Sequence, residues 1–445
     1  MKSNLAIVLL SLAFTSSAAA NGRFPLAQQL VESPKDASVL VLRATFGFVI
    51  SQDAGKTWHW VCEQAVGYSG IEDPAVGVTQ NGAIIAGIFD GLRRSENGGC
   101  DFSFPDSKLE GRYAVDVTVD KKLPSQAYVL TSTGKGGGKF ETMLWRSVDE
   151  GKTFSQLGVS LPEDFLGLTL DPAPSEPTRH YVSGLGALGA GVLYVSSDDG
   201  QSWTSKPVPG TDVQNSPFIG AVHPTDPLTV YLRVTGTDDN RLLVTKDGGE
   251  TFQELFAGGG RMLGFALSPN GDEVTFGYGD PKGGASIDEK TLGLWHALAS
   301  DPVFKRVHTG PVNCLTWTGQ GLYVCGSQFE QGFELARIPD PKLSTTAPEF
   351  TKLFDLKDVA GPLDCPSGSG TTSLCSAAWP ALCELLGRCT DAGSVDAGTS
   401  DAGPGPPAAP SEDCGCRQVG SQPTSSWWMC SIPLVFLGRR RRRPS

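Results

Sequence analysis

The stretch that decides the fold is SQDAGKTW, residues Ser51 to Trp58, in which Ser, Asp, Gly, Thr and an aromatic residue follow at fixed spacing. The pattern Ser/Thr-x-Asp-x-Gly-x-Thr-Trp/Phe returns, with small changes, as SENGGCDF (Ser95 to Phe102), SVDEGKTF (Ser147 to Phe154), SSDDGQSW (Ser196 to Trp203) and TKDGGETF (Thr245 to Phe252). A catalytic loop has no reason to occur five times in one chain. These five turn motifs therefore indicate a repeated structural unit.

The spacing of the turn motifs identifies the repeated unit. Successive motifs begin 44, 52, 49 and 49 residues apart, a period typical of a propeller blade. Between them lie short alternating stretches rich in Val, Ile, Leu, Phe and Tyr and bounded by turn residues, which predict strands; residues 75–95 alone predict three. The rhythm continues without the motif through residues 262–307 and 312–356. The sequence therefore predicts an all-β, seven-bladed propeller over residues 24–358.

How the ring closes is left open by the sequence. Three predicted strands precede the first motif, in residues 25–30, 38–44 and 46–51. A closed ring removes two exposed sheet edges. The N-terminal segment therefore completes the sheet of either the last blade or the first.

The five octapeptides resemble the Asp-box, or BNR, repeat of sialidases and sortilin-type receptors. The resemblance implies that each motif closes the turn between the third and fourth strands of a blade. An Asp side chain can accept backbone N–H bonds inside such a turn, and Gly supplies a positive φ. The final aromatic residue can pack between neighbouring sheets. We therefore interpret the residues at the third motif position as structural, namely Asp53, Asn97, Asp149, Asp198 and Asp247.

The first twenty residues predict a secretory signal peptide. Lys2 precedes an apolar run from Leu5 to Phe14, and Ala18 and Ala20 are placed for cleavage before Asn21. The apolar run is too short for a permanent membrane span. We therefore expect the mature protein to be exported.

Export changes how the 11 cysteines are interpreted, because an oxidising compartment favours disulfides. Cys62 follows the first motif and Cys100 lies inside the second, so we predict that they pair across adjacent blades. Cys314 and Cys325 flank an alternating stretch with a Gly turn, which predicts a disulfide across a hairpin. The sequence does not rank the pairings of Cys365, Cys375, Cys383 and Cys389. A zinc site is the alternative for this cluster, although neither C-x-x-C spacing nor a nearby His supports it.

Beyond the predicted propeller the composition changes. Residues 359–390 are Cys-rich, with a short helix expected around Ala377 to Leu386. Residues 391–413 repeat Asp-Ala-Gly and then become Pro-rich, which predicts a linker without a core. Residues 414–445 join Cys414 and Cys416 to an apolar stretch from Trp427 to Leu437 and five consecutive Arg.

This C-terminal segment resembles the MYXO-CTERM sorting tail of myxobacterial surface proteins. The resemblance implies processing by a sortase-like membrane protease and anchoring through Cys414 or Cys416. Basic residues also stay on the cytoplasmic side of a membrane, which fits a halt in the inner membrane. The apolar stretch is shorter than the roughly twenty residues of a full span. Display on the outer cell surface is therefore predicted, with secretion to the medium as the alternative.

The search for an active site begins with sialidases, which carry an Arg-Ile-Pro motif in the first blade. ARIPDP, from Ala336 to Pro341, contains these letters but falls in the predicted last blade, where it indicates a strand end entering a turn. GKGGGK, from Gly134 to Lys139, lacks the Ser/Thr and following helix of a phosphate-binding loop, so we expect a mobile hairpin loop.

Single side chains also fail to reveal an enzyme. Four acids near predicted strand ends are candidates for a glycosidase acid pair, whose separation the sequence does not give: Asp116, Asp171, Glu273 and Asp301. The five His show no metal-binding spacing: His59, His180, His223, His296 and His308. We therefore identify no catalytic residue, cofactor site or metal site.

Three functions remain. The favoured one is a non-catalytic, surface-tethered binding or adhesion module for protein or glycan, acting as a monomer. The alternatives are an extracellular glycoside hydrolase or other polysaccharide-active enzyme, and a structural or assembly protein of the envelope. Nucleic acid is not expected as a partner, because the net charge is −12 and the surface would repel it.

Overall fold

The computed structural model describes residues 25–236, 240–279, 289–339 and 348–389. Within this part the strands form seven sheets, all but the first two of four strands. Each sheet is built from strands that are consecutive in sequence, apart from one added strand in the first. We number the sheets as blades 1 to 7 in chain order.

Blades 1 to 4 contain the following strands, given from the inner edge of each sheet outward: blade 1, β1 (Ala27–Glu32), β2 (Leu40–Ala44), β3 (Gly47–Ser51) and β4 (Trp58–Val61); blade 2, β5 (Ala75–Val78), β6 (Ile84–Ile88) and β7 (Gly91–Ser95); blade 3, β8 (Ala114–Val119), β9 (Ala127–Gly136), β10 (Lys139–Ser147) and β11 (Ser155–Gln156); blade 4, β12 (Leu166–Ala173), β13 (Glu176–Leu185), β14 (Gly191–Ser196) and β15 (Thr204–Pro207). Short helices α1 (Glu63–Val66) and η1 (Ala187–Gly189) lie in connections.

Blades 5 to 7 repeat the arrangement: blade 5, β16 (Ser216–Val222), β17 (Val230–Thr235), β18 (Asn240–Thr245) and β19 (Gln253–Gly258); blade 6, β20 (Arg261–Leu267), β21 (Glu273–Gly279), β22 (Gly293–Leu298) and β23 (Asp301–His308); blade 7, β24 (Cys314–Thr318), β25 (Gly321–Cys325), β26 (Leu335–Ile338) and β27 (Thr351–Phe354). Helix α2 (Gln328–Gln331) lies between β25 and β26.

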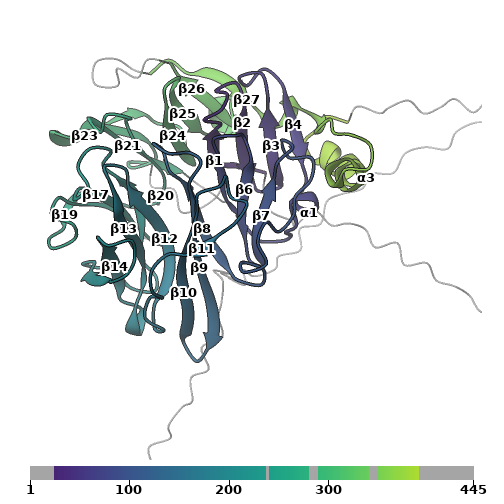
Figure 1. Ribbon diagram of the computed structural model, residues 1–445. Coiled ribbons are helices and arrows are strands. Elements are labelled where there is room, and N and C mark those ends of the chain that lie inside the picture. Colours follow the sequence, from purple (N-terminus) through teal and green to yellow (C-terminus); the bar gives the residue numbers. More distant parts are fainter. Residues whose placement is uncertain (1–24, 237–239, 280–288, 340–347, 390–445) are drawn as a thin grey trace, which may run out of the picture. The chain divides into compact units, whose positions relative to one another are not determined.

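The first strands of the blades form a closed ring. β1 contacts β5, and the contacts continue through β8, β12, β16, β20 and β24 back to β1 (Figure 1). The predicted seven-bladed propeller is therefore confirmed, including the two blades that lack the turn motif.

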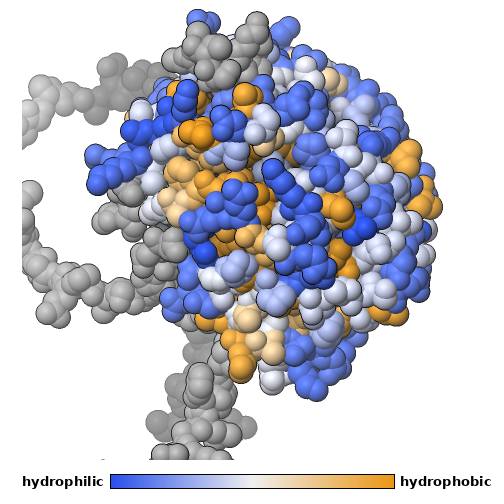
Figure 2. Space-filling model, turned by 90° about the vertical axis from the view of Figure 1, so that its left-hand side faces the viewer, coloured by the Kyte–Doolittle hydropathy of each residue, from blue (hydrophilic) through white to orange (hydrophobic). Residues whose placement is uncertain are grey.

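The core lies between the blades because each middle strand is covered on both faces. All five residues of β3 are buried, whereas both residues of the outer strand β11 are exposed. Figure 2 shows the side of the molecule that carries β19 and β23, where apolar side chains appear in groups interrupted by polar ones. The outer strands therefore present a mixed surface to solvent.

The N-terminal segment forms the inner strand of blade 1, so it does not add a strand to blade 7. Side-chain hydrogen bonds connect blade 7 to blade 1 where the ring closes. Thr316 Oγ1 donates a hydrogen bond of 2.9 Å to Leu30 O, and Trp58 Nε1 donates one of 2.9 Å to Leu353 O. Among the described residues, blades 1 and 7 are separate sheets, so no ladder of backbone hydrogen bonds closes the ring.

A C-terminal segment supplements the closure, and we call residues 359–388 the clasp. After the single-turn helix η2 (Leu356–Asp358), β28 (Val359–Pro362) pairs in parallel with β4 as a fifth strand of blade 1. Helix α3 (Gly370–Leu385) then packs against α1 and β4 (Figure 1). It begins earlier than the predicted helix because the Ser369 side chain accepts a hydrogen bond from Thr372 N and caps it.

The disulfides correct one prediction from the sequence. The pairing of Cys62 with Cys100 is wrong: Cys62 is bonded to Cys375, and Cys100 to Cys365. The clasp passes over both residues and supplies each of them with a partner. Cys383 and Cys389 are disulfide-bonded as well.

The other predicted disulfide, Cys314–Cys325, is present and joins directly paired residues of β24 and β25. Other predictions lie outside the described residues: the signal peptide of residues 1–20, the linker of residues 391–413, and the tail with Cys414 and Cys416. None of the helices in the described part of the chain has the length and apolar content needed to span a bilayer.

Candidate functional site

All five turn motifs connect the third strand of a blade to the region of the fourth, in blades 1 to 5. In the third motif, Asp149 Oδ1 accepts hydrogen bonds from Ser147 Oγ at 2.8 Å and Thr153 N at 2.9 Å. Asp149 Oδ2 accepts one from Thr153 Oγ1 at 2.7 Å. Burial alone would raise the pKa of Asp149, but the hydrogen bonds from Thr153 and Ser147 outweigh it and lower that pKa. The Asp149 carboxylate therefore makes these hydrogen bonds within its own turn.

The same bonds recur at Asp53, Asp198 and Asp247. Hydrogen bonds from the Ser202 side chain and backbone hold the pKa of Asp198 at about 2. Such a group is ionised at neutral pH and is not poised to transfer a proton. These acids stabilise turns.

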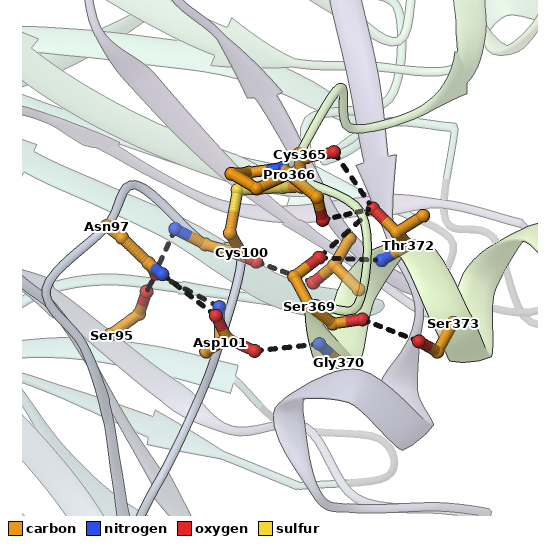
Figure 3. The surroundings of a disulfide bond; sticks show 12 residues. Ser95, Asn97, Cys100, Asp101, Cys365, Pro366, Ser369, Gly370, Thr372 and Ser373 are labelled. Carbon is orange, nitrogen blue, oxygen red and sulfur yellow. Dashed lines mark hydrogen bonds between the residues drawn. A yellow bond between two sulfur atoms is a disulfide. The ribbon is translucent and has the colours of Figure 1, made fainter.

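The second motif differs from the other four (Figure 3). Asn97 replaces the usual Asp and Asp101 replaces the usual Thr, and the hydrogen bond between the two positions is reversed: Asn97 Nδ2 donates to Asp101 Oδ2 at 2.9 Å. This reversal leaves Asp101 Oδ1 free to accept a bond of 2.7 Å from Gly370 N, at the start of α3. The bond from Gly370, followed by that from Asn97, lowers the pKa of Asp101. The second motif thus holds the clasp.

Sequence reasoning missed this role, although a signal was present. The second motif is the only one of the five with a Cys, and its two polar substitutions occur as a pair. Together they indicate a turn adapted to a contact outside its own blade.

Two of the four candidate acids, Asp116 and Asp171, are brought together on neighbouring inner strands. Asp116 on β8 is half-buried, and its carboxylate accepts hydrogen bonds of 2.9 Å from Val117 N and from Leu170 N on β12. Thr169 joins blades 4 and 5 in the same way, by accepting a bond of 2.8 Å from Ile219 N. Burial raises the pKa of Asp116 to about 6. Asp116 therefore links two blades.

Asp171 on β12 is also half-buried, and its carboxyl group makes no hydrogen bond with any residue that the structure describes. Burial raises its pKa to about 7; the charge of Lys121 opposes this shift and that of Asp116 adds to it. Asp171 borders a cavity of about 110 Å³ together with Lys121, Pro172 and Val222. At about 30 Å³ for each water of liquid volume, that space suits a few waters rather than a sugar ring.

The other two candidate acids do not join this pair. Glu273 Oε2 lies 2.8 Å from His296 Nε2, and Asp301 is exposed on the outer strand β23. His180 Nε2 is similarly paired, with Asp199 at 3.0 Å. Within the described ranges no three His, Cys, Asp or Glu side chains are grouped to hold a metal ion.

Two sequence patterns lie in ordinary secondary structure. Residues 134–139 form the end of the β9–β10 hairpin, in which Gly136 pairs with Lys139. The Ala-Arg-Ile of the Arg-Ile-Pro motif ends β26 at Ile338. Neither segment builds a site, and residues 340 and 341 lie outside the described residues.

Comparison with known proteins supports the fold alone. No protein-family model matches the chain, and neither does any curated protein. An ancestral GH74 enzyme is similar in structure, with a TM-score of 0.56 and 14% identity, over 75% of this chain and 47% of that one. YCF48 from Cyanidioschyzon merolae gives a TM-score of 0.47 and 14% identity, over 69% of this chain and 94% of that one. This chain thus spans about half the length of the GH74 enzyme.

Proposed function

We propose that this protein is an exported, surface-tethered propeller that binds a protein or glycan ligand without transforming it. We also assign the five turn motifs to the Asp-box class and the final segment to the MYXO-CTERM class of sorting tails. The motif hydrogen bonds described above support the first assignment, and the order of Cys pair, apolar stretch and Arg cluster supports the second.

The non-catalytic assignment rests on the positions and hydrogen bonds of the four candidate acids. A glycosidase needs two carboxyl groups on opposite sides of a substrate. Here Asp116 is bonded to two backbone amides, Glu273 is paired with His296, and Asp301 is on the outer edge of blade 6. The Asp171 carboxyl makes no hydrogen bond with the described residues, and it borders a cavity of about 110 Å³. These acids therefore do not flank a space that suits a sugar.

The test is a glycan and polysaccharide array read out both for binding and for release of reducing sugars. We expect binding without hydrolysis. A second candidate function, hydrolysis, is favoured by one observation, the pKa of about 7 at Asp171, which suits a general acid. Release of sugars that is abolished in Asp171→Asn would establish that function and overturn ours.

The tether is tested separately in protein recovered from the native host. We expect mass spectrometry to find no peptide from Trp427 to Ser445 and to find a lipid-sized addition on a peptide containing Cys414 or Cys416. An unmodified chain that ends at Ser445 and is recovered from the medium would refute it.

A further inference from the structure

Blade 2 has a gap where the other blades have a fourth strand. Its sheet ends at β7, and beyond β7 only a single bridge forms, in which Arg94 and Ser103 exchange backbone hydrogen bonds of 2.9 and 3.1 Å. A cavity of about 540 Å³ lies there, and we call it the rim pocket. Its wall includes Arg94, Glu96, Asn97, Asp101, Phe104 and Lys152. This volume lies within the usual range for small-ligand sites.

One side of the rim pocket is held rigidly by the clasp (Figure 3). Asn97 and Asp101 bond to each other, Asp101 bonds to Gly370, and the neighbouring Cys100 is bonded to Cys365. The Asn97 side chain also accepts hydrogen bonds of 3.0 Å from Ser95 Oγ and from Asp101 N. Side chains fixed in this way lose little conformational entropy when a ligand binds.

The acids of the rim pocket already have partners. Asp101 accepts a hydrogen bond on each carboxylate oxygen, and Glu96 forms an ion pair with Arg94 Nη1. The charge of Glu96 is thus compensated by Arg94, whereas Asp101 keeps its charge and is stabilised by two neutral donors.

The donors of the rim pocket are not all used. Arg94 is 6% exposed; its Nε donates to Glu150 O at 2.8 Å, but its Nη2 is buried without a hydrogen-bond partner among the described residues. Lys152 is exposed, and its only side-chain interaction with the described residues is a longer-range attraction to Glu96. A buried donor without an acceptor destabilises the folded protein. A ligand that supplies acceptors would satisfy both cations.

We propose that the rim pocket binds the carboxylate of an acidic sugar, such as a uronate residue in a polysaccharide. The carboxylate accepts hydrogen bonds from Lys152 and from the Arg94 guanidinium, which is the type of contact that guanidinium groups favour. Phe104 and Pro105 provide an apolar wall for the C–H face of the sugar ring. Because it names the ligand class, this inference rests on the proposed binding function.

The experiment uses the full chain, oligogalacturonate as the probe, and calorimetry at low and moderate salt. Lys152 is the sixth residue of the third turn motif, and Lys56 is the sixth residue of the first motif, where blade 1 has its fourth strand. Lys152→Met should weaken binding at least tenfold, whereas the matched variant Lys56→Met should leave it within twofold. A neutral oligosaccharide of equal length should not displace the probe.

Several outcomes would overturn the assignment. It fails if Lys152→Met binds as tightly as the unaltered protein, if Lys56→Met weakens binding equally, or if the neutral oligosaccharide competes. If the protein binds another ligand on the array and Lys152→Met has no effect, the binding function stands and the rim pocket is refuted. A folded protein that binds nothing on the array and not the probe refutes both.

Discussion

Asp101 Oδ1 accepts a hydrogen bond of 2.7 Å from Gly370 N, although the two residues are 269 positions apart in the chain. The bond places an anionic side chain at the N-terminus of α3, where the helix dipole favours negative charge. Thr371 strengthens the contact, because its N–H donates to Cys100 O at 3.0 Å and its hydroxyl to Gly99 O at 2.7 Å. A turn that elsewhere serves one blade here joins blade 2 to the C-terminal segment.

The two clasp disulfides should contribute more to stability than the hairpin disulfide. Cys62–Cys375 and Cys100–Cys365 close loops with separations of 313 and 265 residues, against 11 for Cys314–Cys325. Removal of a disulfide should lower the free energy of unfolding by about 2–5 kcal/mol. Because the loop-closure entropy grows with loop length, the loss should be larger for the two longer loops. We expect paired Cys→Ser variants in guanidinium denaturation to follow this order. Equal losses in all three pairs would contradict it.

Removal of a turn-motif carboxylate should destabilise the fold without altering ligand binding. Asp149→Ala removes the acceptor for three hydrogen bonds, from Ser147 Oγ, Thr153 N and Thr153 Oγ1, each with a net value of about 1 kcal/mol. The melting temperature should fall, while affinity in the folded fraction stays unchanged. Asp301→Ala, at an exposed outer strand, is the control and should melt like the unaltered protein. Intact stability with lost binding in Asp149→Ala would show that the motif is functional.

Replacement of Asn97 by Asp, the residue that the other four motifs carry at this position, should lower the stability of the protein. Asn97→Asp replaces the donor that Asp101 Oδ2 uses with a second carboxylate, so two like charges face each other. This repulsion raises a carboxyl pKa in the folded state, so the loss of stability is present at neutral pH. It should shrink as the pH falls toward 4 and one carboxyl is protonated. A loss that does not change between pH 7 and pH 4 would argue against charge repulsion as its cause.

The buried acid Asp171 should make stability depend on pH in a definite direction. Its folded-state pKa is about 7, above the value near 4 of an unfolded chain. Between these values the folded state binds more protons, so the contribution of Asp171 to stability falls as the pH rises from 4 to 7. Asp171→Asn should therefore flatten the curve of unfolding free energy against pH and raise stability at pH 8 by about 1 kcal/mol or more. An unchanged curve would refute the burial effect.

A small gain in stability is expected at Ala54. This residue has a φ of 61°, in the left-handed region, and it is exposed. The left-handed conformation destabilises the folded state by about 1–2 kcal/mol for an L-residue. Glycine avoids this cost, but its greater loss of backbone entropy on folding costs about 0.5–1 kcal/mol. Ala54→Gly should thus raise the free energy of unfolding by up to about 1 kcal/mol, measured by denaturant titration. Destabilisation would show that the methyl group matters.

The sequence predicted the blades because their signals are local. Each turn motif and each alternating stretch depends on neighbouring residues, so seven blades could be counted in advance. The partners of Cys62 and Cys100 could not be predicted in this way, because they depend on where residues 363–375 pass after the whole ring has formed.

The candidate acids illustrate the same distinction. Local patterns placed Asp116 and Asp171 near strand ends, but their proximity follows from the contact between β8 and β12 in the closed ring. The rim pocket depends on a missing fourth strand in blade 2, and the sequence between Ser103 and Tyr113 carries no clear sign of that omission.

The clasp also determines where a mechanical load would enter the molecule. A pulling force applied beyond α3 reaches Cys375, and then Cys365, before it reaches any strand of blade 7. Both covalent bonds pass the tension into blades 1 and 2, whose turns hold Cys62 and Cys100. Blade 7, which among the described residues is joined to blade 1 through side-chain hydrogen bonds, therefore lies further along the path of the load. A load applied on the C-terminal side would therefore be carried by blades 1 and 2 before it is carried by blade 7.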